Sequence, residues 1–369
     1  MPRKPFPKIL VLVIIWANML TIASSQPRAT AEVDATKCWS SPAPEGSGLG
    51  FASDGARLYT GGDGGRIEAL SLDGKKMWGT ELGGDINSNL LSMDTGLFLT
   101  TTTASTDSTS SVGNQIRSLS KGTGITNWTG KFPAASQNYL NAYLDSIVVV
   151  SKNGMIHSID AKTGSVKWKR EIAEGFVAEP GFYAENLIVA STAKQVFVIS
   201  LATGEIDSMR KLPFAVTAIG QTSAGDLIVG DERGNITLFL GNTEKIEWRF
   251  RSGGEISAII PIGDRILVSS HDNFAYSLIT KTGRVAWKKR LSGRVSHIAT
   301  YEGLYALLSG FEDHGAVLTD LSNGKVAGQI VLGEDENLTF DPIVSKGLIF
   351  ILTNGSVRAF SLNGCTATK

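Results

Sequence analysis

The sequence carries little charge and has no excess of either sign. Its 369 residues include 35 Lys and Arg and 35 Asp and Glu, so the formal net charge is zero at pH 7. Charged residues make up 19% of the chain, whereas a globular protein usually contains about 25%. A chain without a basic surplus has no field that draws nucleic acid or an anionic membrane. The composition therefore excludes a polymer partner held mainly by charge.

The sequence also lacks the motifs of common catalytic sites. Its four histidines, His157, His271, His297 and His314, have no metal-ligand spacing to one another and no cysteine nearby. There is no G-x-S-x-G nucleophile elbow and no G-x-x-x-x-G-K-[ST] phosphate loop. We therefore expect no catalytic residue and no metal site built on these histidines.

Two stretches resemble ligand sites but have simpler explanations. GGDGG at 61–65 joins two expected strands instead of opening a helix, which favours a hairpin turn over a phosphate cradle. The acidic run Glu334, Asp335 and Glu336 could hold Ca²⁺ weakly, but a solvated loop between repeats is the simpler interpretation. We expect no bound cofactor and no metal at either stretch.

The first 25 residues have the pattern of a secretory signal. A basic start precedes an apolar core of about 15 residues, and small residues follow at 23–25. Because roughly 20 apolar residues are needed to span a bilayer, we favour a cleaved signal over a retained membrane anchor. No cysteine stands where a lipoprotein signal requires one. We expect a periplasmic, cell-surface or secreted protein, with a signal at 1–25, a linker at 26–37 and one domain at 38–369.

One phrase of the sequence returns about every forty residues. SIDAKTGSVKW at 158–168 is followed by SLITKTGRVAW at 277–287. The turn glycine of this phrase aligns along the chain at intervals of 50, 40, 40, 40, 39, 41 and 40 residues, with Glu244 in the one position that lacks glycine. The aligned glycines are Gly74, Gly124, Gly164, Gly204, Gly283, Gly324 and Gly364. Eight turns at this regularity indicate eight copies of one structural unit.

Each repeat reads as a set of short strands. In the third repeat, SIVVVS, MIHSID and SVKWKREI are separated by turn residues, and a less distinct strand precedes them. The turn glycine, Gly164 in this repeat, suits a hairpin turn that needs a positive φ. Four antiparallel strands in forty residues make one propeller blade. The sequence therefore predicts an all-β, eight-bladed β-propeller of four-stranded antiparallel blades.

Tryptophans mark the same repeat. Five follow the turn position by four residues: Trp78, Trp128, Trp168, Trp248 and Trp287. Ser208 and Gly328 occupy this position in the fourth and seventh repeats. Trp39 lies one repeat length before Trp78, yet no complete blade precedes it. We therefore assign Trp39 to the last blade, where residues 37–40 would supply the outer strand and close the ring without a free edge.

The two cysteines fall at this closure. Cys38 and Cys365 are separated by almost the whole chain. On the repeat they would lie two positions apart on the composite outer strand, at the junction of the two chain ends. In an oxidising compartment we expect a disulfide that closes the ring. Two free, buried thiols are the alternative.

The phrase A-x-D-x-x-T-G-x-x-x-W resembles the repeat signature of quinoprotein-type, or PQQ-like, propellers. Residues 158–168 fit it except for Ser158, and the resemblance covers about residues 38–369. In that family the indole docks between neighbouring blades, which implies the same structural role for the tryptophans above, Trp39 included. Size and blade number are most similar to the BamB-type propeller lipoproteins of the outer-membrane β-barrel assembly machinery, which are scaffolds. This chain departs from them because it has no lipid-attachment cysteine after the signal.

The same resemblance raises an enzymatic alternative. Dehydrogenases that use pyrroloquinoline quinone (PQQ) share the blades but usually carry more sequence between them, a set of calcium ligands and, in many cases, two adjacent cysteines. Adjacent cysteines do not occur here. A PQQ-dependent dehydrogenase is therefore our third hypothesis for the function.

Charged loop tips in three successive repeats suggest where a partner binds. They are the expected connections between second and third strands in the fifth to seventh blades: Asp231, Glu232 and Arg233; His271, Asp272 and Asn273; Glu312, Asp313 and His314. We expect these tips, here called the rim loops, to bind a protein, with solvated turns as the simpler alternative. A glycan site needs exposed aromatic side chains, and few lie on these tips. The Ser/Thr-rich insertion at 101–113 is expected to be a mobile loop, either a partner-binding or glycosylated arm or a tolerated insertion.

These observations lead to one functional hypothesis and a runner-up. We expect a monomeric, non-catalytic propeller that mediates protein–protein interaction outside the cytosol, with partners in the cell envelope or secretory pathway. Outer-membrane protein assembly is the process that the resemblance implies. A module that binds envelope polysaccharide is the runner-up.

Overall fold

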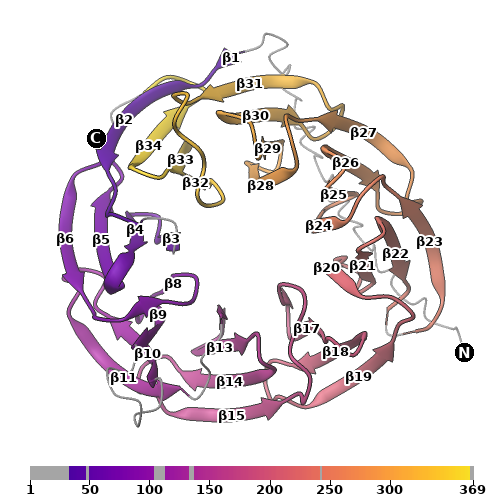
Figure 1. Ribbon diagram of the computed structural model, residues 1–369, viewed down its shortest axis with the longest axis horizontal. Helices are drawn as coiled ribbons and strands as arrows, with labels where there is room; N and C mark the ends of the chain where they lie inside the picture. The colour runs from indigo at the N-terminus through magenta and orange to yellow at the C-terminus, as the bar shows by residue number, and fades with distance from the viewer. Residues whose placement is uncertain (1–32, 47–49, 104–112, 133–136, 242, 366–369) are drawn as a thin grey trace, which may run out of the picture. The chain divides into compact units, whose positions relative to one another are not determined.

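The computed structural model describes residues 33–46, 50–103, 113–132, 137–241 and 243–365. These residues form eight β-sheets arranged around a ring, each with its first strand toward the centre and its last strand at the periphery (Figure 1). The predicted eight-bladed propeller is confirmed. The expected signal at 1–25, the first part of the expected linker and the middle of the Ser/Thr-rich insertion lie outside the described residues.

The first four blades contain the strands between residues 50 and 211. Blade 1 consists of β3 (Gly50–Ser53), β4 (Arg57–Gly62), β5 (Arg66–Ser71) and β6 (Lys76–Glu81). Blade 2 consists of β7 (Asp85–Ile86), β8 (Leu91–Met93), β9 (Gly96–Thr103), β10 (Gly113–Leu119) and β11 (Thr126–Phe132). Blade 3 consists of β12 (Asn138–Tyr143), β13 (Ser146–Ser151), β14 (Met155–Asp160) and β15 (Val166–Glu171). Blade 4 consists of β16 (Gly181–Tyr183), β17 (Asn186–Ala190), β18 (Gln195–Ser200) and β19 (Ile206–Lys211).

The other four blades complete the ring. Blade 5 consists of β20 (Val216–Gln221), β21 (Leu227–Asp231), β22 (Asn235–Phe239) and β23 (Ile246–Arg251). Blade 6 consists of β24 (Ile256–Ile262), β25 (Arg265–Ser270), β26 (Phe274–Ile279) and β27 (Val285–Arg290). Blade 7 consists of β28 (Val295–Tyr301), β29 (Tyr305–Gly310), β30 (Gly315–Asp320) and β31 (Val326–Val331), joined by β1 (Val33–Asp34). Blade 8 consists of β32 (Ile343–Ser345), β33 (Leu348–Leu352), β34 (Ser356–Ser361) and β2 (Thr36–Pro42).

The turn between the third and fourth strands has the geometry that its glycine predicts. In blade 3, Gly164 has φ 75°, and the pairing of β14 with β15 shifts register between Ser158 and Ile159. Such a bulge after a glycine of positive φ is a common hairpin geometry, which a Cβ would oppose. The GGDGG stretch also forms a hairpin connection: β4 ends at Gly62, a short 3₁₀ turn spans Asp63–Gly65, and β5 follows.

Apolar side chains fill the space between each pair of neighbouring blades. The described residues form eight buried clusters, and each draws its members from two adjacent sheets. Both faces of a blade are thus covered, so every residue of the second strand β13 is buried, whereas the peripheral β15 alternates exposed and half-buried positions. The ring is held by blade-to-blade packing, and one missing side chain affects two blades.

Six indoles dock onto the next blade in the same way. Each Nε1–H donates to a backbone carbonyl in the next blade at 2.8–3.2 Å, as from Trp287 to Leu321 at 2.9 Å. Each ring also lies against the turn glycine of that blade, so a Cβ on Gly324 would come within 2.6 Å of Trp287. The docked residues are Trp39, Trp78, Trp128, Trp168, Trp248 and Trp287. The position lacks an indole at Ser208, where Arg210 instead stacks over Phe239 at 4.3 Å.

The N-terminal segment closes the ring. Strand β2 pairs antiparallel with β34, so Trp39 belongs to the last blade, as predicted. The strand begins at Thr36, and before it β1 pairs in parallel with β31, with Val33 opposite Gly328. The segment therefore runs beside the peripheral strand of blade 7 at Gly328, the second position that lacks an indole.

The disulfide is also present, with one difference in its placement. Cys38 and Cys365 are bonded, and their Cα atoms lie 5.3 Å apart. Cys38 lies on β2, but Cys365 follows the turn after β34 and is not part of a strand. Residues of the N-terminal segment alone form the outer strand of blade 8, because β2 pairs with β34 from Thr36 onward.

Candidate functional site

The three rim loops connect second to third strands, as expected. They follow β21 in blade 5, β25 in blade 6 and β29 in blade 7. In an antiparallel blade these loops lie at the opposite end from the turns between third and fourth strands. The rim loops thus belong to three consecutive blades and to one face of the ring.

The three aspartates of the rim loops bond within the fold. Asp231 is 1% exposed and accepts hydrogen bonds from the backbone N–H groups of Arg233 (2.9 Å) and Asn235 (2.8 Å). Asp272 accepts from the Gly253 N–H at 2.7 Å and the Tyr276 hydroxyl at 2.6 Å. Asp313 likewise accepts from the N–H groups of Gly310 and Ser292, at 2.8 and 3.2 Å. The aspartates therefore fix the loops, and contact with a partner depends on their neighbours.

We expect Asp231→Ala to destabilise the propeller by about 1–3 kcal/mol, because the donors that its carboxylate satisfies would lose their partner. The adjacent Glu232 is exposed and forms no hydrogen bond through its side chain within the described residues, so Glu232→Ala should change stability by less than about 0.5 kcal/mol. Urea unfolding of both variants tests the difference. Equal midpoints would show that Asp231 does not hold its loop.

Sequence reasoning missed an exposed aromatic side chain next to the rim loop of blade 7. Glu232, Arg233, Glu312 and His314 are exposed, and Phe311 beside Glu312 is 75% exposed. The backbone under it is fixed, because the N–H of Phe311 donates to Arg294 O at 2.7 Å and that of Glu312 to Ser292 O at 3.0 Å. An exposed aromatic ring on a fixed backbone is the kind of residue that anchors protein interfaces.

A hollow lies at the centre of the ring, where three inner strands are interrupted. In blade 2 the inner strand is split into β7 and β8, which both pair with β9. In blades 4 and 8 only β16 and β32 remain, each preceded by a single bridge. Pro180 and Pro342 stand directly before these two strands, and proline has no N–H to donate to the ladder. The inner strand of blade 4, within the segment FVAEPGFY at 176–183, is therefore only three residues long.

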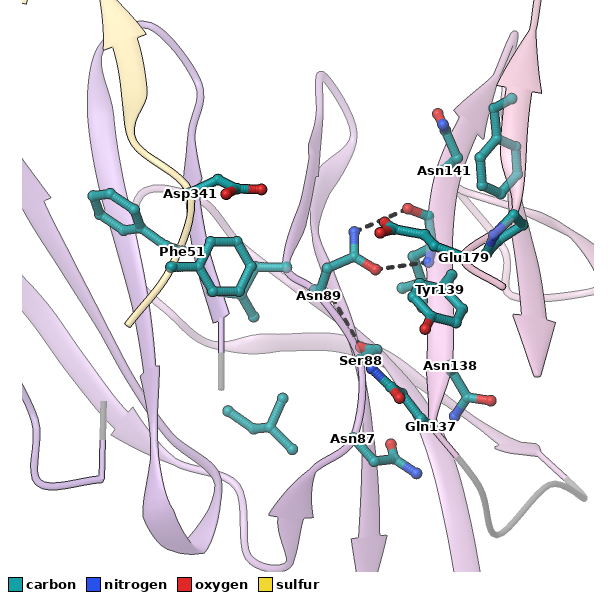
Figure 2. A pocket seen from close by; sticks show the side chains of 16 residues that line it. Phe51, Asn87, Ser88, Asn89, Gln137, Asn138, Tyr139, Asn141, Glu179 and Asp341 are labelled. Carbon is teal, nitrogen blue, oxygen red and sulfur yellow. Dashed lines mark hydrogen bonds between the residues drawn. The ribbon is translucent and has the colours of Figure 1, made fainter. Parts of the chain in front are cut away.

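The interrupted segments line a cavity of about 650 Å³. Figure 2 shows Asp341 on one side of it and Glu179, Tyr139 and Asn141 on the other. An adjoining hollow of about 410 Å³ shares Asn141, Glu179 and Asp341 and extends along blades 5–7. We call the two hollows together the channel.

Burial and the charges of the channel carboxylates raise the pKa of several groups that line the channel. Desolvation, together with a smaller effect of the negative charge of Asp341, raises the pKa of Glu179, whose side chain is exposed toward the channel. Burial, with a smaller effect of Glu179, raises the pKa of the Tyr139 hydroxyl. Burial is also the main cause that raises the pKa of Tyr183 to about 12. The surroundings of Glu179 thus favour either its neutral form or an ionised form that accepts a hydrogen bond from a bound ligand.

The channel does not fit the quinone considered above. Its lining residues include two carboxylates and, within the described chain, no Lys, Arg or His. PQQ carries carboxylate groups of its own, and like charges in a partly desolvated site repel. Nor does the described part of the chain bring three His, Cys, Asp or Glu side chains together in a group able to hold a metal ion. In the acidic run at 334–336, Glu336 pairs with Arg358 and accepts from the Gly333 N–H at 2.9 Å.

The described residues contain no helix with the length and apolarity needed to cross a membrane.

Comparisons with known proteins agree with this architecture. The family model described as outer membrane protein assembly factor BamB matches residues 28–174, 143–207 and 207–364. The outer membrane protein assembly factor BamB of Burkholderia pseudomallei is 24% identical over 187 residues, which are 49% of this chain and 38% of that protein. The alignment thus spans well under half of the length of this relative.

Solved structures show the same fold. BamB from Moraxella catarrhalis superposes with a TM-score of 0.68 at 15% identity, covering 90% of this chain and 99% of that one. The computationally designed Ika8 protein gives a TM-score of 0.70 at 14% identity, covering 87% and 97%. The C-terminal WD40 domain of Sif2 gives 0.67 at 11% identity, covering 90% and 100%. At these identities the likeness concerns the fold alone.

Proposed function

Because this chain belongs to the family of the outer membrane protein assembly factor BamB, we propose that it is a non-catalytic scaffold of outer-membrane protein assembly, working outside the cytosol. The observation that carries the proposal is the match of the family model from residue 28 to residue 364, which covers all eight blades. The disulfide supports an extracytoplasmic location, since such bonds persist in oxidising compartments.

The rim loops are the surface we assign to the protein partner. Phe311 is exposed on a backbone that is held by hydrogen bonds, and charged side chains lie next to it in the chain and on the loop of blade 5. An aromatic anchor within a polar rim is a common arrangement in protein interfaces. The ring gives this surface a fixed shape, so little conformational entropy is lost when a partner binds.

The proposal predicts that Phe311→Ser removes function without unfolding the protein. In a strain of the source organism that lacks this chain, we expect folded outer-membrane β-barrel proteins to decrease, and the wild-type chain to restore them. Phe311→Ser should restore them poorly, because interface anchors typically contribute at least about 2 kcal/mol to binding, or some thirtyfold in affinity. Levels of heat-modifiable barrel proteins in membrane fractions give the measurement.

Ile125→Ser is the matched control. Ile125 is 68% exposed and lies in the turn between the third and fourth strands of blade 2, on the other face of the ring. This variant should restore assembly fully, and both variants should melt like the wild type. If removal of the chain leaves barrel proteins unchanged, the proposed function is wrong; if both variants behave alike, the rim loops are not the partner surface.

A further inference from the structure

Four polar side chains in the channel have hydrogen-bonding atoms that no other described residue uses. The Tyr139 hydroxyl, the Asn141 amide and the Glu179 carboxylate form no hydrogen bond within the described residues. Asp341 uses Oδ1 toward His297 Nδ1 (3.1 Å) and the N–H of Ile298 (3.3 Å), which leaves Oδ2 available. By contrast, Asn89 in the same wall bonds the backbone of Leu140 with both ends of its amide. Its Oδ1 accepts from the Leu140 N–H at 2.8 Å, and its Nδ2 donates to Leu140 O at 2.9 Å. The available groups therefore face the cavity and not the blades.

Aromatic rings supply the apolar part of the same walls. Phe51 from blade 1, Phe182 from blade 4 and Phe340 from blade 8 line the cavity beside these polar groups. The lining thus combines flat apolar faces with carboxylate, amide and hydroxyl groups, and within the described chain it includes no basic side chain. A pocket of about 300–1,000 Å³ with a few convergent polar groups has the usual size and composition of a small-molecule site.

We infer that the channel binds a saccharide without negative charge, of one or two sugar rings. Sugar hydroxyls donate strong hydrogen bonds to carboxylate oxygens. The same hydroxyls can accept hydrogen bonds from the Tyr139 hydroxyl and the Asn141 amide. The C–H face of a sugar ring packs against aromatic rings such as Phe182 and Phe340. Within the described residues no basic side chain pairs with Glu179, and His297 alone bonds Asp341, so the two carboxylates disfavour anionic ligands by repulsion.

The state of Glu179 agrees with this ligand. Desolvation and the charge of Asp341 raise its pKa, and a hydroxyl donor at its oxygens would stabilise the ionised form. The inference goes beyond the proposed scaffold function and does not use the rim loops. It also locates aromatic side chains for glycan binding in the channel, where sequence reasoning had sought them only on the loop tips.

The test is titration calorimetry and saturation-transfer NMR on the full chain with defined probes. Maltose, N-acetylglucosamine, its β-1,4 disaccharide and glucosamine are the uncharged or amine-bearing sugars. N-acetylneuraminic acid is the anionic sugar, and spermidine is a cation that is not a sugar. We expect saturable binding of at least one of the first group, and binding at least tenfold weaker for N-acetylneuraminic acid.

Variants assign the binding to the channel. Glu179→Gln should weaken the sugar at least tenfold, because it replaces a charge-assisted hydrogen bond with a neutral one. Tyr139→Phe should weaken it several-fold. Glu205→Gln, on an exposed turn of blade 4 at the periphery, is the matched control and should leave affinity unchanged. Melting temperatures of all variants should match the wild type, since neither channel group bonds within the fold.

Three results would overturn the inference. They are no saturable binding of any uncharged or amine-bearing sugar, equal affinities for Glu179→Gln and Glu205→Gln, and binding of spermidine that depends on Glu179 in the absence of sugar binding. The last result would identify the channel as a site for organic cations. None of these results bears on assembly of barrel proteins, which is measured separately with Phe311→Ser.

Discussion

A chain in which serine replaces both Cys38 and Cys365 should be less stable than the wild type by up to about 5–6 kcal/mol. The bond spans 327 residues, and the chain-entropy model assigns the largest stabilisation to the longest loops. Cys365 is exposed and Cys38 half-buried, so serine fits either site with little loss of packing. The effect should therefore come from the bond itself. Urea unfolding under non-reducing conditions measures it.

Reductant provides the control for this prediction. Dithiothreitol should lower the unfolding midpoint of the wild type toward that of the double-serine variant and leave the variant unchanged. A double-serine variant as stable as the wild type in both conditions would contradict the role of the bond in ring closure, as would peptide mapping that finds two free thiols.

Trp287→Ala should destabilise the propeller by about 3–5 kcal/mol, the usual cost of removing a large buried aromatic side chain. The indole is 7% exposed, donates to Leu321 O at 2.9 Å and covers Gly324, so its loss opens a cavity between blades 6 and 7. Gly324→Ala should also destabilise, because its Cβ would come within 2.6 Å of Trp287 and its φ is 73°.

Met209→Ala is the comparison for this pair. Met209 is 53% exposed on β19, in the blade whose indole position holds serine, so its truncation should change stability by less than about 0.5 kcal/mol. Denaturant unfolding of the three variants distinguishes the effect of losing the docked indole from the effect of losing an exposed apolar side chain. Equal midpoints for Trp287→Ala and Met209→Ala would show that the indole does not hold neighbouring blades together.

The sequence predicted the ring because its strongest signals are local. A glycine such as Gly164 is required by the φ of its own turn, and Trp168 follows at a fixed distance, so each repeat can be recognised without knowledge of its neighbours. The position of Trp39 then identified the closure. Strand β1 and the first residue of β2 were not predicted, because residues 33–36 pair with strands some three hundred residues away and carry no repeat signal.

The candidate sites were predicted less well, because the role of a polar residue depends on its partners. Asp231 and Glu232 are adjacent acidic residues on one loop, yet the first is buried and bonded and the second is exposed. The channel had a signal that could have revealed it. Glu179 and Asp341 each precede a proline, and each lies seven residues before the second strand of its blade, at Asn186 and Leu348.

Site-specific photocrosslinking at position 311 tests the central claim most directly. A benzoyl-phenylalanine in place of Phe311 should crosslink in cells to a component of the outer-membrane protein assembly apparatus, identified by mass spectrometry of the adduct. The same probe in place of Ile125 should give no such adduct, because that turn lies on the other face of the ring. Adducts of equal yield at both positions, or none from position 311, would contradict a scaffold that binds its partner through the rim loops.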